Sequence, residues 1–595
     1  MHLISLFRRR LRKVLESRKY RCWVKKYGLL TEAERTLVQK KIDTLDLFSL
    51  PKISVVMPVC NPPLRFLEEA VASVTSQIYP HWELCIVDDG STDKAIIMWL
   101  RALEKKGLRI KINFLKKRSG IAAATNAALR MASGEFIAFL DHDDCFSLDA
   151  LAEVALAIAA IPNVAYLYSD EDKIDARGER CDPFFKPDWN PDLLTSLNYC
   201  SHLSIIRKVI IDEVGGLNSD LEGAQDWDLI LRVTERVESN QIIHLPKVLY
   251  HWRISQNSTA RSIRAKPYVT IASKKVLEQA LERRGCAAIG IDLVMAGGHW
   301  KVCHALPDVL PFVSIIILTH SSIDLLKICI ESLCSQTKYK HYEILIMDSN
   351  SHDEKTLRYY SQIKKEKNIR IIPSPDASNY SAMNNHAVAH ARGEILLLLN
   401  NTMEVIQPGW LAELVAQAVR PEVGAVGALL YSSNGRVQYA GTILGMGDLA
   451  GDVGKFFRKQ HYVGGNRMSV VQNFSALTGA CLAVRKKVYE EVGGFDQIDL
   501  PVAFSDIDFC LKLQQAGYRN VWTPFAELIH HSLASAAPEK KKRFKKEAAL
   551  LRLRWGELIK DDPAYNPNLT LEREDWSLAW PPRKRENWGQ RNTCF

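Results

Sequence analysis

The sequence predicts an α/β protein built from two copies of one nucleotide-binding type of domain. In the first copy, short apolar runs of strand length alternate with amphipathic stretches of helix length, an order typical of parallel strands joined by right-handed crossovers. The same order starts again after residue 310, and Ser54 and Asp88 have counterparts at Ser314 and Asp348, each 260 residues further on. An offset this constant indicates a duplicated domain and not a short-period repeat.

Short-range patterns predict the elements of the first copy. Residues 29–50 have the pattern of a polar helix, with Thr31 as its N-cap and Glu34 closing a capping box. The apolar run at 53–59 is long enough for a buried strand and too short for a helix. By the same reasoning we expect strands over 83–87, 110–114 and 136–140. The longer stretches between the strands predict helices over 64–74 and 122–131.

The totals allow several domains. The chain has 595 residues, of which 47% are hydrophobic and 25% charged, so it holds enough apolar material for more than one core. Glycines and prolines gather around 287–311, where we expect the join between the copies. The predicted parts are a basic helical segment (1–50), a first domain (51–290), a second domain (311–555) and a tail (556–595).

The net charge of +10 is concentrated near the N-terminus. Residues 1–28 hold ten basic side chains against Glu16 alone, so the rest of the chain is close to neutral and we expect no nucleic-acid-binding domain. Apolar residues recur there at helical spacing, namely Ile4, Phe7, Leu11 and Val14. This pattern is typical of a basic amphipathic helix on an anionic membrane surface; a solvated helix packed on the next domain is the alternative.

The sequence shows no uncharged apolar stretch long enough to span a membrane. Basic residues interrupt the early apolar run, so no cleavable signal peptide is visible. The thirteen cysteines are scattered and form no metal-binding pair, which fits reduced thiols. We therefore expect a cytoplasmic protein, peripherally associated with the inner face of the cell membrane.

Three carboxylates follow the apolar run 136–140 within four residues: Asp141, Asp143 and Asp144. Like charges this close repel, so a stable fold keeps them where a cation or solvent neutralises them. Ligands of parallel α/β sheets bind at the carboxyl ends of strands, and oxygen ligands suit a hard cation such as Mg²⁺ or Mn²⁺. The alternative is an acidic turn that caps a helix starting near Ser147.

Four motifs of the first copy follow one another in order. They lie at 55–61 (VVMPVCN), 87–93 (VDDGSTD), 133–144 (SGEFIAFLDHDD) and 225–229 (QDWDL). With these motifs the copy resembles glycosyltransferase family 2, the nucleotide-sugar-dependent transferases of the GT-A fold. The whole chain looks most like the bacterial tandem transferases of O-antigen and other surface-polysaccharide synthesis. The resemblance implies two tandem GT-A domains with a Rossmann-like, nucleotide-sugar-binding sheet.

The resemblance also implies a donor site and a metal site in the first copy. The implied nucleotide-binding residues are Pro58, Asn61, Asp88, Asp89, Gly90, Ser91 and Asp141. Asp143 is the expected metal ligand, with Asp141 and Asp144 as helpers, because a divalent cation stabilises the charge on a departing nucleoside diphosphate. His251 is a candidate third ligand, with packing beside aromatic residues as the alternative. Arg118 faces the diphosphate or is a plain surface arginine.

Transfer needs a base that accepts the proton of the acceptor hydroxyl as it attacks the anomeric carbon. The family has this base in the motif matched by 225–228, so the resemblance implies Asp226 as the base and Asp228 as an orienting residue. The alternative is that both only cap the helix that follows. One in-line displacement predicts inversion at the anomeric carbon.

The second copy departs from this pattern. It keeps Asp348 for the donor nucleotide and Asp506 for catalysis, but Thr402 stands at the position of the metal aspartate. A neutral hydroxyl is a poor ligand for a divalent cation. Three accounts stay open: Glu404 takes over the cation, the metal is dispensable, or the domain only holds an acceptor glycan. We favour a weakened or acceptor-binding second domain.

The expected function is that of an inverting, metal-dependent glycosyltransferase. Its donor is a nucleotide sugar, and its acceptor is a lipid-linked or growing oligosaccharide of the cell surface. A sugar-phosphate nucleotidyltransferase is an alternative, but it normally has a Gly-rich basic loop after the first strand, which 58–63 lacks. A membrane-surface scaffold that binds glycans or nucleotide sugars without transfer is another, and the intact acidic set of the first copy argues against it.

Overall fold

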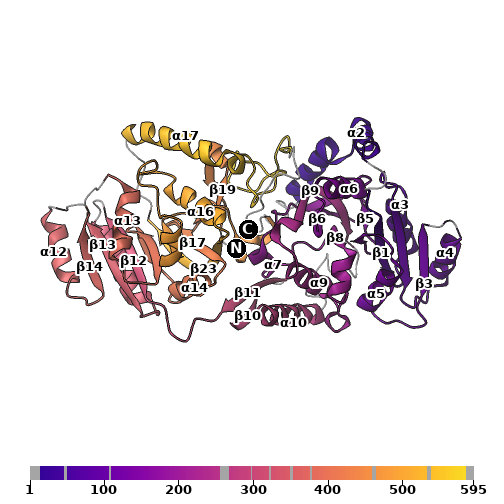
Figure 1. Ribbon diagram of the computed structural model, residues 1–595, viewed down its shortest axis with the longest axis horizontal. Helices are drawn as coiled ribbons and strands as arrows, with labels where there is room; N and C mark the ends of the chain where they lie inside the picture. Colours follow the sequence, from indigo (N-terminus) through magenta and orange to yellow (C-terminus); the bar gives the residue numbers. More distant parts are fainter. Residues whose placement is uncertain are drawn as a thin grey trace.

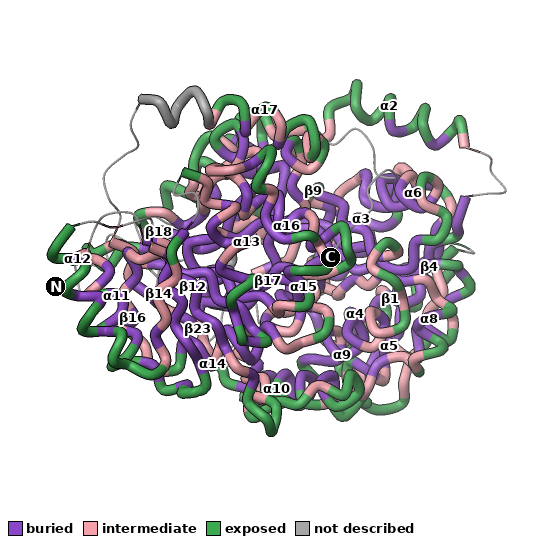
Figure 2. Tube along the Cα trace, turned by 60° about the vertical axis from the view of Figure 1, so that its left-hand side comes forward, coloured by how far each residue is buried: buried purple, intermediate pink, exposed green. Residues whose placement is uncertain are grey.

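The computed structural model describes residues 14–45, 50–105, 107, 109–254, 267–295, 298–319, 323–348, 351, 353–374, 378–458, 464–531 and 538–584. Two α/β domains lie side by side, the first in indigo to magenta and the second mostly in orange (Figure 1). Each is built on a large mixed sheet with helices on both faces, and buried residues run through both domains (Figure 2). The predicted α/β fold with a duplicated domain is therefore confirmed.

In the described part of the chain, the first sheet has nine strands in the order β3-β2-β1-β4-β8-β6-β9-β5, with β7 beside β6. These strands are β1 (Ile53–Val59), β2 (Trp82–Asp88), β3 (Ile110–Phe114), β4 (Phe136–Phe139), β5 (Cys145–Phe146), β6 (Tyr166–Ile174), β7 (Arg180–Phe184), β8 (Ser204–Arg207) and β9 (Ile242–Arg253). Strand β1 pairs in parallel with β2 and β4, so Val59 lies beside Asp88 and Val56 beside Phe139. The carboxyl ends of the three strands therefore meet at one edge, where the predicted motifs follow them.

Helices cover both faces of this sheet because β1 is apolar on both sides. Val55 and Met57 belong to one core and Val56 to the other, as the two-residue period of a strand requires. The helices are α3 (Leu64–Thr75), α4 (Lys94–Glu104), α5 (Ile121–Met131), α6 (Ala150–Ala160), α7 (Pro191–Leu194), α8 (Lys208–Glu213), α9 (Gln225–Thr234) and α10 (Pro267–Arg283). Helices α3, α4 and α6 contribute to the first of these cores, and α5, α9 and α10 to the second.

The second sheet repeats the strand order of the first and has one additional strand, β21, in the described part of the chain. Its order is β14-β13-β12-β15-β22-β17-β23-β16, with β18 beside β17 and β21 beside β23. The strands are β12 (Val313–Thr319), β13 (Tyr342–Asp348), β14 (Ile369–Pro373), β15 (Ile395–Asn400), β16 (Met403–Val405), β17 (Val423–Tyr431), β18 (Val437–Tyr439), β21 (Gln472–Asn473), β22 (Cys481–Arg485) and β23 (Arg519–His530). The helices are α11 (Ile323–Gln336), α12 (Glu354–Ile363), α13 (Tyr380–His390), α14 (Trp410–Ala418), α15 (Lys486–Glu491), α16 (Ser505–Gln515) and α17 (Pro538–Lys560).

The two copies also share a buried polar contact. In each, a glutamate at the second residue of the second strand accepts a hydrogen bond from the serine of the first: Glu83 from Ser54 at 2.6 Å and Glu343 from Ser314 at 2.8 Å. A buried carboxylate is tolerated only when it is bonded in this way. Between the two large sheets the chain forms a hairpin of β10 (Ala288–Met295) and β11 (His299–His304), in the region where the join was expected. A second small pair, β19 (Thr442–Leu444) and β20 (Ala450–Asp452), lies within the second copy.

The N-terminal segment packs on the protein. Residues 14–23 are helical and continue into a π-helical turn, η1 (Val24–Gly28), and α2 (Glu32–Asp43) then begins with the predicted capping box of Thr31 and Glu34. Tyr20 and Trp23 are buried, and the Trp23 indole donates a hydrogen bond to the Ala579 carbonyl at 3.0 Å. This part of the segment fits the alternative of a helix packed on protein. The remaining residues of the amphipathic pattern, 1–13, lie outside the described residues.

The tail after α17 crosses to the first domain (Figure 1). The side chains of Asn566 and Asn568 donate hydrogen bonds to Asp170 on β6, at 2.9 and 3.1 Å. Asp170 is fully buried and also bonds His244 at 3.0 Å.

Among the helices that the structure describes, none is long and apolar enough to cross a membrane.

A buried ion pair joins the domains. Asp192 on α7 lies 2.6 Å from Arg420 and 3.3 Å from Arg519 of the second domain, and Asn473 donates a hydrogen bond to it at 2.6 Å. Burial alone would raise the pKa of Asp192, but the two guanidinium groups more than offset this and hold it below its usual range. The domains are therefore held together by paired charges, and Val470 of the second domain also packs in a core of the first.

Candidate active site

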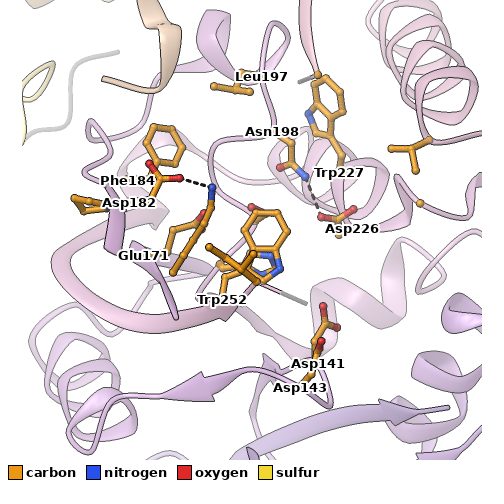
Figure 3. A pocket seen from close by; sticks show the side chains of 18 of the residues that line it. Asp141, Asp143, Glu171, Asp182, Phe184, Leu197, Asn198, Asp226, Trp227 and Trp252 are labelled. Carbon is orange, nitrogen blue, oxygen red and sulfur yellow. Dashed lines mark hydrogen bonds and ion pairs between the residues drawn. The ribbon is translucent and has the colours of Figure 1, made fainter. Parts of the chain in front are cut away.

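A cavity of about 1510 Å³ opens in the first domain at the carboxyl ends of β1 and β4. Its lining comes from the loops after these strands, from the segment 197–202 and from the start of α9. Residues 15–20 and 569–578 also contribute to it. Figure 3 shows its middle: Asp141 and Asp143 lie on one side of Trp252, and Asn198 and Asp226 lie together above them. Three of the predicted site carboxylates therefore line one space.

The predicted donor residues form a network of loops at one end of this cavity. Asn61 accepts hydrogen bonds from the backbone of Thr92 and Asp93, so it ties the loop after β1 to the loop after β2. Asp89 accepts the N–H groups of Ser119 and Gly120, at 2.6 and 2.9 Å, and fixes the start of α5. Together these bonds bring three loops to one place.

Asp88 is the last residue of β2 and lies directly before the loop that follows it. One of its carboxylate oxygens accepts the N–H of Ser91, while Oδ1 is buried without a hydrogen-bond partner. Gly90 has φ +66°, and a Cβ there would lie 2.7 Å from the Arg118 nitrogen, so only glycine fits this turn. Pro58, Asn61, Asp89 and Arg118 line the cavity itself.

The three carboxylates of the acidic turn have different positions. Asp141 and Asp143 line the cavity, whereas Asp144 is fully buried. The Tyr250 hydroxyl and the Arg253 N–H donate to its two oxygens at 2.6 and 2.7 Å, and burial followed by repulsion from Asp143 and Asp141 raises its pKa well above the ordinary value. Both oxygens of Asp144 are thus bonded inside the fold, and its role as a helper in metal binding stays a prediction.

The ring of His251 is bonded to a carboxylate of the neighbouring strand β6. Its Nδ1 lies 2.6 Å from Asp172 Oδ1, and Asp172 in turn bonds Tyr20 and Arg180. Among the described residues, no group of three or more His, Cys, Asp or Glu side chains is placed to hold a metal ion. His251 is not among the residues that line the cavity with Asp141 and Asp143, and its role as a third metal ligand stays a prediction.

Asp141 and Asp143 nevertheless fit a divalent cation that also binds a phosphate. Burial raises the pKa of Asp143, His142 partly offsets this, and repulsion from the neighbouring Asp141 adds to the rise. Mg²⁺ is commonly bound through one or two carboxylates plus substrate phosphates, so it does not need a full set of protein ligands.

Asp226 lies in the first turn of α9, at the middle of the cavity. The Asn198 amide donates to its Oδ2 at 2.9 Å, and Asn198 Oδ1 is buried without a partner. Burial raises the pKa of Asp226, and His202 partly offsets this. Asp228 points away and pairs with Arg232 at 2.6 Å, which suits a residue that orients the helix.

Sequence reasoning missed several cavity residues. Asn198 and His202 lie in a segment without a motif, and only its place before β8 would have suggested the cavity. The His202 ring stacks on Tyr250, with ring centroids 4.5 Å apart. Tail residues 573 and 575–578 also line the cavity, although they follow the first domain by more than 280 positions, and no local signal could have placed them there.

The second copy has other contacts at the corresponding positions. Oδ1 of Asp348 accepts hydrogen bonds from Tyr360 and Ser351, at 2.9 and 2.6 Å, where Asp88 Oδ1 has no partner. At the 260-residue offset Tyr360 corresponds to Leu100, which has no hydroxyl. Asp506 accepts the N–H groups of Gly479 and Ile507 at 2.8 and 2.9 Å, and burial raises its pKa.

The second copy has no carboxylates at the positions of the acidic turn. Asp141, Asp143 and Asp144 correspond by alignment of β4 with β15 to Asn400, Thr402 and Met403. Glu404 pairs with His531 at 2.7 Å. Polar and apolar side chains thus replace the three carboxylates, and the nearby glutamate already has a partner.

Known proteins similar to this chain identify its family. The model of Glycosyl transferase family 2 matches residues 54–215 and 314–493, more than half of the chain. The chain is 44% identical over 536 residues to the uncharacterized protein y4gI of Sinorhizobium fredii, covering 89% of this chain and 59% of that protein. It is 39% identical over 543 residues to the O-antigen biosynthesis protein RfbC of Myxococcus xanthus, covering 90% of this chain and 42% of that protein.

The chain therefore spans about half the length of the curated relatives it matches. A solved structure of an S. aureus TarS fragment with UDP-GlcNAc covers 39% of this chain and 66% of that chain, with 22% identity and a TM-score of 0.32. The family match in both copies is the decisive finding: this chain belongs to glycosyl transferase family 2.

Proposed function

We propose that the chain is a glycosyltransferase whose first domain moves a sugar from a nucleotide-sugar donor to a surface glycan. The observation that carries the proposal is the single cavity that contains Asp141, Asp143 and Asp226 beside the turn of Asp88. A donor contact, a cation contact and a base are the three groups that this transfer needs. The family membership and the name of the O-antigen relative support the same reaction class.

The donor would bind at the end of the cavity formed by the loops after β1 and β2. The buried Oδ1 of Asp88 has no partner, and such an atom is costly unless a ligand donates a hydrogen bond to it. A nucleoside offers donors of this kind on its base and ribose. Arg118 lines the same end and would face the diphosphate.

Asp141 and Asp143 would hold Mg²⁺ or Mn²⁺ together with that diphosphate. The cation would supply positive charge to the departing nucleoside diphosphate. The two carboxylates would in turn keep the donor's phosphate end beside Asp226.

Asp226 is the proposed general base. It would take the proton of the acceptor hydroxyl while the oxygen forms a bond to the anomeric carbon and the bond to the diphosphate breaks on the opposite face, so the configuration inverts. Asn198 holds one carboxylate oxygen at 2.9 Å, which leaves the other for the acceptor. Burial strengthens this base by raising its pKa.

The second domain would serve as an auxiliary domain and not as a second transferase. Tyr360 and Ser351 already bond the carboxylate of Asp348, and Thr402 replaces the metal aspartate. Asp506 nevertheless keeps a base-like position, which makes it the matched control for Asp226.

The remaining parts of the proposal concern place and acceptor. The acceptor would be a lipid-linked or growing oligosaccharide, and the basic N-terminal segment would hold the protein at the inner, anionic face of the cell membrane.

The test is nucleoside diphosphate release by the purified chain from a panel of nucleotide sugars, with and without Mn²⁺. Asp143→Ala and Asp226→Asn should each lower turnover about a hundredfold or more, and Asp506→Asn should leave it near the wild-type rate. Full activity of Asp143→Ala would overturn the cation site. An equal loss in Asp506→Asn would show that the second domain also turns over.

A further inference from the structure

The cavity extends past Asp226 into a space bounded by residues 15–20 and 569–578, which we call the outer arm. Its walls are the N-terminal helix, the β6–β7 hairpin and the tail. Residues that line it include Tyr20, Glu171, Asp182, Phe184, Trp576 and Leu578. In Figure 3, Glu171, Asp182 and Phe184 lie across Trp252 from Asp226, so the arm leads away from the proposed base.

Hydrogen bonds fix the walls of the outer arm. The Tyr20 hydroxyl donates to Asp172 on β6 at 2.7 Å, and the Tyr20 ring lies edge-on to Phe185, with centroids 6.3 Å apart. In the tail, the Thr570 N–H donates to the Ser577 carbonyl at 2.9 Å and closes the loop that reaches the cavity. The arm is therefore preformed, which reduces the ordering cost of binding.

Acidic side chains in the outer arm are already bonded to basic neighbours. The pairs are Lys173–Asp182 at 2.6 Å, Lys186–Glu171 at 3.0 Å and Arg573–Asp575. Lys19 also lines the arm but is exposed, so water screens its charge. An ionic ligand would have to compete with these pairs, whereas hydroxyl groups can form hydrogen bonds to the paired side chains without displacing the partner.

Aromatic rings supply the apolar part of the arm. Trp576 of the tail loop lines the cavity with one edge, because it is only 7% exposed and otherwise packs in the core of the second domain. Trp252 stands where the arm meets the base, 5.4 Å from the His202 ring. Flat aromatic faces beside paired polar groups suit sugar rings, which have an apolar face and a rim of hydroxyls.

We propose that the outer arm binds the terminal sugars of an uncharged glycan acceptor and directs its terminal hydroxyl towards Asp226. The unpartnered, buried Oδ1 of Asn198 then accepts a hydrogen bond from that sugar at the inner end of the arm. This inference rests on the proposed function, since it assigns the acceptor of the same reaction. It also gives the N-terminal helix and the tail a part in substrate recognition.

The experiment is saturation-transfer NMR on the full chain at millimolar ligand. The neutral probes are maltotriose, mannotriose and N-acetylchitotriose, and trigalacturonate is the matched anionic probe. At least one neutral trisaccharide should bind, and trigalacturonate should give no signal. Stronger binding of trigalacturonate, or no binding of any neutral probe, would overturn the proposal.

The variant Ala176→Trp tests whether the trisaccharide binds in the outer arm. Ala176 is an exposed turn residue that lines the arm, so a tryptophan there fills the arm without disturbing a core, and we expect about tenfold weaker binding of the neutral probe. Ala33→Trp, at an exposed position of α2, should bind like the wild type. Unchanged binding in Ala176→Trp would refute the assignment. Donor hydrolysis by the wild type is measured separately, so a failure of the proposed function would appear there and not in the binding signal.

Discussion

Asp192→Asn tests how firmly the two domains are joined. The carboxylate is 4% exposed and lies 2.6 Å from Arg420 and 3.3 Å from Arg519. The amide keeps the shape but removes the charge, so the half-buried Arg420 loses its nearest carboxylate and the half-buried Arg519 loses one of its two carboxylate partners. Breaking a buried pair costs about 3–5 kcal/mol, and because Glu422 still contacts both arginines we expect the lower end, about 3 kcal/mol.

The assay is urea unfolding followed by tryptophan fluorescence and circular dichroism, because a two-domain chain need not unfold in one step. Glu354→Gln, which removes a pair with Arg358 whose side chains are 80% and 74% exposed, is the control and should leave the midpoint unchanged. A loss below about 1 kcal/mol for Asp192→Asn, the size expected at the surface, would refute the reasoning.

The same ion pair predicts a direction of pH dependence. The folded state lowers the pKa of Asp192, so its stabilising effect is present above the unfolded-state value of about 3.9 and is lost as the pH falls through the folded-state pKa. The unfolding midpoints of wild type and variant should therefore converge in acid. Parallel curves down to low pH would contradict the assignment.

Three further outcomes follow from the structure. Because burial raises the pKa of Asp226, the proposed base, the acid limb of the pH–rate profile should lie above the ordinary aspartate value of about 3.9; a limb at or below that value would argue against this base. Tyr360→Phe removes one donor from Asp348 and should cost about 1 kcal/mol in thermal unfolding while leaving turnover unchanged; a fall in turnover would mean that the second domain contributes to catalysis. Deleting residues 1–13, which hold five basic residues, should release the protein from anionic vesicles but not stop donor hydrolysis; unchanged sedimentation with vesicles would contradict the membrane contact.

The fold was predictable because its signals are local and repeated. Runs such as 53–59 are too short for a helix, and the 260-residue offset between Asp88 and Asp348 required two similar sheets. The capping box of Thr31 and Glu34 was visible for the same reason, since its partners are three residues apart.

The site was less predictable because its details depend on distant residues. The sequence could not tell which carboxylate of the acidic turn faces the cavity, since Asp144 is turned inward by Tyr250 and Arg253, more than a hundred positions later. His251 was a reasonable metal ligand by composition, yet the position of Asp172 on the neighbouring strand decides its orientation. Asn198 had no motif at all.

The link between Asp170 and the tail has a consequence for synthesis. Asp170 is buried in the first domain, but Asn566 and Asn568 are translated almost four hundred residues later. While the ribosome makes the second copy, this carboxylate has only part of its hydrogen bonds, and a domain usually folds as soon as it emerges. The first domain thus reaches its final packing only after residues 566 and 568 have been made, so a ribosome that stalls before residue 566 would release a protein with an incompletely satisfied interior.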